Sequence, residues 1–160
     1  MNDDEVRIYR VKVLGEYCEL LSYTKYLLPG DKAELQILEF MDLDNLYKFY
    51  RELLKDKAKV SYTEALSQVV NSSHWGFCIR SYRLIAYTVL QDENYSANKI
   101  EVLTHELDHL LRPANSLEES ELSAARTGFM AKAAFNILAE SNKQAIELVG
   151  ADMIHVRGTI

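Results

Sequence analysis

Residues 104–116 decide how the rest of this chain is interpreted, and they read Thr104-His105-Glu106-Leu107-Asp108-His109-Leu110-Leu111-Arg112-Pro113-Ala114-Asn115-Ser116. Residues four apart on a helix lie on the same face. His105 and His109 can therefore direct two ring nitrogens at one Zn²⁺ ion, at about 2.0–2.1 Å each. Glu106 lies about 100° further round the helix, where a metal-activated water needs a general base. The spacing predicts a zinc-dependent hydrolase with Glu106 as the catalytic residue.

The surrounding residues indicate that this stretch belongs to an amphipathic helix. Apolar residues recur three and four apart on a face other than the histidine face: Ile100, Leu103, Leu107 and Leu110. Asn98 followed by Glu101 has the pattern of a capping box at the start of the helix, and Pro113 marks its end.

The composition is that of a globular domain. The chain has 160 residues, 48% hydrophobic and 26% charged, with a formal net charge of −6. That charge argues against nucleic acid or an anionic membrane as a partner. The N-terminal residues are acidic, unlike a signal peptide, and two cysteines, Cys18 and Cys78, are too few for a disulfide framework. We therefore expect a cytoplasmic protein, and the oligomeric state stays open.

The hydrophobic pattern predicts an α+β fold that is mainly helical, with a small sheet packed beside the histidine helix. We expect strands over residues 6–13, 75–81 and 84–90, and helices over 16–28, 32–40, 45–54 and 61–70. Pro29-Gly30-Asp31 is a break. We predict a single domain, 1–160, with a helical N-terminal part (about 16–72) and a metallopeptidase-like core (about 73–160).

A catalytic zinc site needs a third protein ligand and one open position. The next segment offers three acidic candidates: Glu118, Glu119 and Glu121. Ser116 and Glu119 form a second capping-box pattern, which gives Glu119 a structural role. Small residues that allow close helix packing follow at helical spacing: Ala124, Ala125 and Gly128. Because Glu121 lies beside these small residues, it is our first candidate for the third ligand, and Glu118 is the second.

The histidine motif followed by Glu119-Ser120-Glu121-Leu122-Ser123-Ala124-Ala125 resembles the minimal gluzincins, especially the ImmA/IrrE-type metallopeptidases. The resemblance covers about residues 96–130. It implies a zincin-like fold, Zn²⁺ as cofactor, a peptide or protein substrate, and Glu121 as the glutamate that completes the site. The chain departs from the family pattern at Leu122 and Asp108, and in the short gap between His109 and Glu121.

The string His105-Glu106-Leu107-Asp108-His109-Leu110 also resembles the HExDHL motif of peptide deformylases. Those enzymes take their third ligand from an upstream Glu-Gly-Cys strand. Trp75-Gly76-Phe77-Cys78-Ile79 is the one counterpart here, and no GxGxAAxQ segment is present. A deformylase-like amidase with Cys78 as ligand is therefore an alternative; otherwise Cys78 is a small buried hydrophobe.

Amide hydrolysis also needs groups around the ligands. Asp108 is a candidate for orienting a ligand imidazole. Four residues are candidate donors to the oxyanion: His155, His74, Tyr87 and Tyr95. We expect His155 to lie in an extended stretch after Gly150.

Two non-enzymatic interpretations stay open. The chain could be a binding or regulatory module, of the kind that phages and mobile elements encode, whose metal only braces the fold. Alternatively, the histidine motif could be a relic that no longer binds metal.

Overall fold

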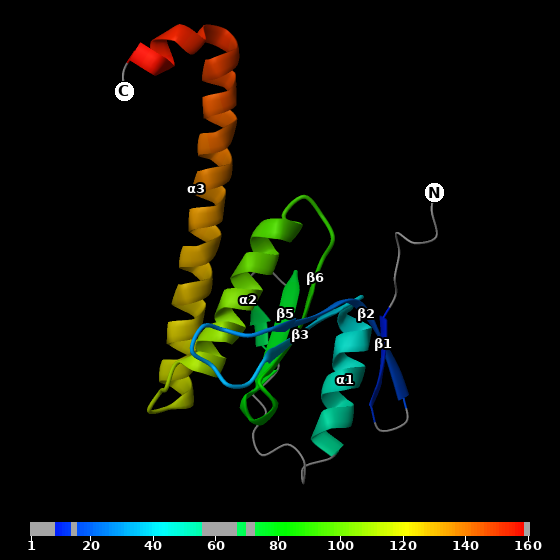
Figure 1. Ribbon diagram of the computed structural model, residues 1–160. Helices are drawn as coiled ribbons and strands as arrows, with labels where there is room; N and C mark the ends of the chain where they lie inside the picture. Colours follow the sequence, from blue (N-terminus) through cyan, green and yellow to red (C-terminus); the bar gives the residue numbers. More distant parts are fainter. Residues whose placement is uncertain (1–8, 14–15, 56–66, 70–72, 159–160) are drawn as a thin grey trace, which may run out of the picture.

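The computed structural model describes residues 9–13, 16–55, 67–69 and 73–158, and the surroundings of the side chains at 18–53 and 73–143. These residues form an α+β fold with one six-stranded sheet (Figure 1). The strands are β1 (Tyr9–Val13), β2 (Glu16–Tyr26), β3 (Leu35–Phe40), β4 (Ser67–Val69), β5 (His74–Ile79) and β6 (Leu84–Val89). The helices are α1 (Leu43–Lys55), α2 (Tyr95–Leu111), α3 (Leu117–Gly158) and the short 3₁₀ helix η2 (Arg80–Tyr82).

The strand order across the sheet is β1-β2-β3-β6-β5-β4. All neighbours are antiparallel except β3 and β6, which run parallel with Glu39 opposite Tyr87. Parallel strands cannot be joined by a tight turn, and the connection between these two includes α1, β4 and β5. Through this parallel pair, the N-terminal strands β1, β2 and β3 belong to the same sheet as β5 and β6, on which α2 packs.

Each face of the sheet buries its own hydrophobic cluster, because successive side chains of a strand point to opposite faces. Under α1, the rings of Phe40 and Phe49 have centroids 5.0 Å apart, and Phe49 stacks on Phe77 at 5.9 Å. The cluster under α2 has five buried members: Cys78, Ile85, Tyr87, Val89 and Val102. α3 packs on α2, farther from the sheet (Figure 1).

The two C-terminal helices approach closely at a glycine. A Cβ added at Gly128 would lie 3.0 Å from the carbonyl oxygen of Glu101 and 3.5 Å from the Cβ of His105. Ala124, one turn earlier on α3, is completely buried. The small residues at these two positions therefore form the contact between α2 and α3, as the sequence predicts.

Changing Gly128 to valine should force α2 and α3 apart. We expect the free energy of unfolding to fall by about 1–3 kcal/mol, the usual effect of overpacking, even though valine is a better helix former than glycine. Zinc affinity should fall as well, because Glu121 would move away from the histidines. Urea unfolding and zinc titration measure the two effects. Ala139→Val, at an exposed position of α3, is the control: it should leave zinc affinity unchanged and lower the free energy of unfolding by no more than about 0.7 kcal/mol, the helix propensity of valine relative to alanine. Equal behaviour of the two variants would contradict the close-packing argument.

Two of the helices predicted in the first half are wrong. Residues 16–28 and 32–40 instead supply the strands β2 and β3. The central strand β3 is buried from both faces, so its apolar residues do not alternate, and a short apolar run fits a helix pattern as well as a strand pattern. β2 has a bulge between Leu20 and Ser22, which interrupts its alternation. The prediction that the N-terminal part, about 16–72, is helical therefore fails for its described residues, which form strands β2, β3 and β4 besides α1.

Several other predictions are confirmed. Strands lie within residues 6–13, 75–81 and 84–90 or within one residue of these bounds, α1 corresponds to the helix predicted over 45–54, and Gly30 has the positive φ of a turn (+87°). Of the helix predicted over 61–70, residues 61–66 and 70 lie outside the described residues, and 67–69 form strand β4 instead.

Candidate metal centre

The buried face of α2 is mostly polar. Eight residues of α2 are buried, and six of them have polar or charged side chains: Asn98, Glu101, His105, Glu106, Asp108 and His109. Its predicted apolar face, which includes Leu103 and Leu107, is only partly buried against the second cluster. Since burying polar groups is unfavourable unless they have partners, this face is where a functional site is expected.

Two histidines and one glutamate converge beside this face. Nε2 of His109 lies 2.9 Å from Oε1 of Glu121, and Nε2 of His105 lies 3.6 Å from Oε2 of the same carboxylate. The imidazole centroids are 4.9 Å apart. One possible ligand atom from each residue lies within 4.8 Å of the other two. Both imidazoles are buried, whereas the Glu121 side chain is 51% exposed, so the group borders on solvent. Its donors fit a metal site with three protein ligands.

The hydrogen bonding and charge of this group suit the binding of a cation. Among the described residues, neither ring nitrogen of His105 has a hydrogen-bond partner, although both are buried. An unsatisfied buried group of this kind costs about 1–3 kcal/mol, and coordination of a metal by Nε2, the nitrogen nearer to Glu121, would remove that cost for one of the two nitrogens. The adjacent imidazoles of His105 and His109 hold the pKa of the Glu121 carboxyl well below its usual range, so that it is ionised at neutral pH.

A serine from α3 orients one of the imidazoles. Nδ1 of His109 lies 2.7 Å from Oγ of Ser120, which is itself buried. This hydrogen bond fixes the ring with Nε2 directed at Glu121. Nothing in the sequence assigns Ser120 a role, because a single serine on a helix matches no motif and only the packing of α3 on α2 brings it to His109.

Changing Ser120 to alanine should weaken zinc binding by about 10–100-fold, the usual effect of removing a partner of a ligand histidine. Competition with a chromophoric chelator measures the dissociation constant. Ser123→Ala is a matched control, because Ser123 lies on the same helix and donates to Asp108 rather than to an imidazole. A zinc affinity that is the same in Ser120→Ala and wild type would show that the hydrogen bond does not orient the ligand.

The glutamate of the motif is buried against the sheet. Glu106 is 1% exposed. A Cβ added at Gly76, on β5, would lie 3.2 Å from Oε1 of Glu106 and 2.9 Å from Cγ2 of Val102. The absence of a side chain at Gly76 therefore gives the Glu106 carboxylate its place, a role that the sequence analysis did not predict.

The alternative third ligands lie elsewhere. Glu118 is exposed at the start of α3, and Cys78 is buried among the apolar residues of the second cluster. Neither belongs to the group formed with the two histidines in the described residues. Oγ of Ser116 accepts a hydrogen bond from the backbone N–H of Glu119, as the capping-box pattern predicts. The Glu119 carboxylate, expected to accept from the N–H of Ser116, instead accepts from the N–H of Asn115.

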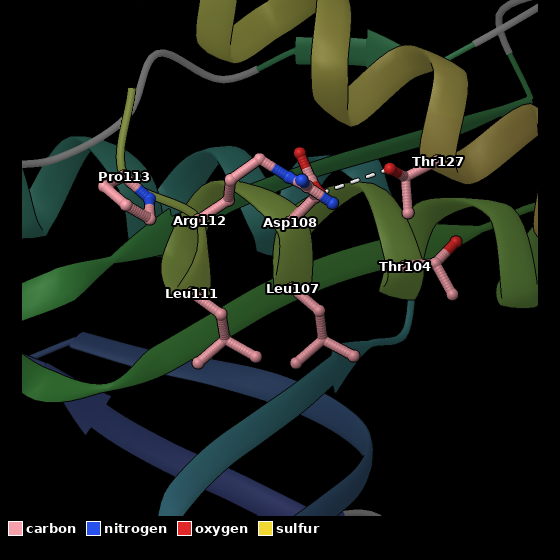
Figure 2. A pocket seen from close by; sticks show the side chains of 7 residues that line it. All are labelled: Thr104, Leu107, Asp108, Leu111, Arg112, Pro113 and Thr127. Atoms are coloured by element: carbon pink, nitrogen blue, oxygen red, sulfur yellow. Dashed lines mark hydrogen bonds and ion pairs between the residues drawn. The ribbon is translucent and has the colours of Figure 1, made fainter. Parts of the chain in front are cut away.

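Asp108 joins the two helices and does not bind an imidazole, which corrects the role predicted for it. Its carboxylate accepts hydrogen bonds from Arg112 and Ser123, both at 2.7 Å, and from Thr127 at 3.2 Å. Burial tends to raise the pKa of Asp108, but these hydrogen bonds outweigh it and the pKa is lowered. Asp108 and Thr127 face each other (Figure 2). They border a hollow of about 430 Å³. None of the residues that line the hollow belongs to the group of His105, His109 and Glu121. The lining residues are Thr104, Leu107, Asp108, Leu111, Arg112, Pro113 and Thr127.

The two tyrosines predicted as oxyanion donors instead donate hydrogen bonds to the carboxylate of Glu39. Tyr87 donates to Oε1 of the buried Glu39 at 3.0 Å, Tyr95 donates to Oε2, and Nζ of Lys99 lies 3.0 Å from Oε1. Burial and then the carboxylate raise the pKa of both tyrosines. These hydroxyls therefore hold β3, β6 and α2 together.

Of the two histidines predicted as oxyanion donors, His74 is engaged with a buried carboxylate. Nε2 of His74 lies 2.5 Å from Oε2 of Glu101, with both side chains buried, and burial lowers the pKa of His74 despite this carboxylate. Because α2 begins at Tyr95, Glu101 is inside the helix, and the capping box predicted at Asn98 is wrong. His155 lies within α3, so the extended stretch predicted there is also wrong, and its side chain is outside the described residues.

Comparisons with protein-family models, with curated proteins and with solved structures find no match. In the part of the chain that the structure describes, no helix has the length and apolar character needed to cross a membrane.

Proposed function

We propose that this chain is a zinc-dependent metallopeptidase with a zincin-like site, in which His105, His109 and Glu121 hold Zn²⁺ and Glu106 is the catalytic base. The observation that carries the proposal is the convergence of three ligand atoms from two helices within 4.8 Å. Two imidazoles and one carboxylate are an established ligand set of catalytic zinc. The unsatisfied nitrogens of His105 and the ionised Glu121 fit a bound cation.

The protein side chains have distinct roles in this proposal. Bound Zn²⁺ supplies Lewis acidity, which lowers the pKa of water towards about 7 and polarises a peptide carbonyl. The carboxylate of Glu106 takes the proton from the attacking water and passes it to the nitrogen of the leaving amine. Ser120 keeps Nδ1 of His109 engaged, so that Nε2 is available to the metal. Gly76 leaves room for Glu106 against the sheet.

The ligand set also bears on the alternative functions. A deformylase-like site would use Cys78, which is packed among apolar side chains. A purely structural zinc site has four protein ligands, whereas three converge among the described residues. The exposed side of Glu121 leaves space for a substrate. These observations favour a catalytic site of the gluzincin type over both alternatives.

The test begins with protein freed of metal by a chelator. Titration with Zn²⁺ should give one ion per chain, and the zinc-loaded protein should cleave members of a peptide mixture followed by mass spectrometry. Chelation should stop the cleavage, and added zinc should restore it. Failure to bind zinc would refute the metal centre; zinc binding without cleavage would favour the structural metal, and cleavage confined to N-formyl peptides would favour the deformylase.

A further inference from the structure

The last helix extends well past the elements that support it. α3 has 42 residues, which corresponds to about 63 Å at 1.5 Å per residue. It contacts α2 at Lys132, whose Nζ lies 3.8 Å from Oε1 of Glu101, and it continues beyond the start of α2 (Figure 1). A helix this long gains most of its stability from packing rather than from helix propensity.

The part of α3 near this point is apolar on more than one side. Residues 129–139 contain one charged side chain, Lys132. Phe135 is partly buried, and the other large apolar side chains of this segment are 52–70% exposed: Phe129, Met130, Ile137 and Leu138. A helix that is apolar nearly all round is normally buried, and exposed apolar surface of this kind marks an interaction site.

Some of the exposed residues form a stripe on one side of the helix, whereas the exposed Leu138 lies outside this stripe. At about 100° per residue, six exposed residues fall within an arc of about 100°: Arg126, Phe129, Met130, Ala133, Ile137 and Glu140. Ala124 and Gly128, which face α2, lie on the opposite side of α3. The stripe therefore points away from the rest of the molecule, and Glu121 of the candidate metal centre is not part of it.

We propose that this stripe binds the same stripe of a second copy of the chain, with the two α3 helices antiparallel and the two-fold axis at Ala133. In a two-fold contact, residue i faces residue j and j faces i. With the axis at Ala133, Phe129 faces Ile137 of the second copy, and Arg126 faces Glu140. Each of these contacts occurs twice. Small side chains at the axis let the helices approach closely.

Charge complementarity is what selects a second copy as the occupant. Arg126 and Glu140 are the charged residues of the stripe, and they lie at equal distances on either side of Ala133. An antiparallel pair therefore opposes unlike charges at both ends of the apolar segment, whereas a parallel pair would place Arg126 against Arg126 and Glu140 against Glu140. Such flanking charges determine partner and orientation in paired helices.

Charge reversal tests the contact and its orientation together. Light scattering should give wild-type protein twice the 18.4 kDa of one chain. Arg126→Glu and Glu140→Arg should each raise the dimer dissociation constant at least about tenfold, because each creates two like-charged contacts. The double variant should dimerise as wild type does, and an equimolar mixture of the two single variants should form a heterodimer. Lys143→Glu, which changes the net charge as Arg126→Glu does but lies outside the stripe, should have no effect.

Cysteine cross-linking gives a second measurement that does not depend on charge. Ala133→Cys should form a disulfide-linked dimer under mild oxidation, since the two copies of this position meet at the axis. Ala139→Cys, also exposed but about 120° round the helix, should not. Circular dichroism and zinc titration of each variant establish that the chain is folded. A folded wild-type protein that is monomeric at about 100 µM, or a double charge reversal that fails to restore dimerisation, would overturn the proposal.

Discussion

Replacing Glu106 with glutamine should reduce peptide hydrolysis by about 10²–10⁴-fold, the usual contribution of a general acid–base, while the protein keeps its zinc. Glutamine has nearly the same size as glutamate and fits the space beside Gly76, but its amide cannot accept the proton of water. The value of kcat/KM on a peptide found by the cleavage screen, measured together with the zinc content, tests both parts of the expectation.

The result depends on a control with the same chemical change. Glu118→Gln removes an exposed carboxylate at the start of α3, outside the ligand group, and it should leave kcat/KM unchanged. Full activity of Glu106→Gln would mean that another group takes the proton. Loss of zinc from the folded Glu106→Gln variant would mean that Glu106 is a ligand rather than a base.

Replacing Glu121 with alanine should raise the zinc dissociation constant by more than about 100-fold. Removing a ligand should weaken binding more than removing a residue that only hydrogen-bonds to a ligand, which costs about 10–100-fold. Because the Glu121 side chain is half exposed, its removal should leave the packing of α2 and α3 intact. Zinc should raise the melting temperature of wild-type protein by binding only the folded state; a concentration 100 times the dissociation constant is equivalent to about 2.7 kcal/mol. That stabilisation should be almost absent in Glu121→Ala.

Two further alanine variants distinguish the candidate ligands. Glu118→Ala should bind zinc as wild type does. Cys78→Ala should be less stable, because it leaves a small cavity in the second cluster, but its zinc affinity should not change. If zinc is lost from folded Cys78→Ala and kept by Glu121→Ala, the deformylase-like ligand set is correct and the one proposed here is not.

The local part of the site is predictable from the sequence because its geometry is set within one helix. The four-residue spacing of His105 and His109 places both rings on one side of any α-helix, and that is how α2 presents them. Strands β5 and β6 are also predictable, since both are rich in residues that favour extended structure. The small residues of α3 correctly indicate a close contact between helices.

Tertiary structure decided the rest, because the interactions concerned join residues far apart in the chain. Strands β2 and β3 exist through backbone pairing with β1 and β6, which a local apolar pattern does not contain. Glu101 resembles a helix cap in sequence, yet it is buried against His74 of β5. The sequence ranks Glu121 before Glu118, but it is the packing of α3 on α2 that brings Glu121 to the two histidines and Ser120 to His109. The sequence by itself thus determined a helix with two histidines on one face, and the fold determined which side chains surround them.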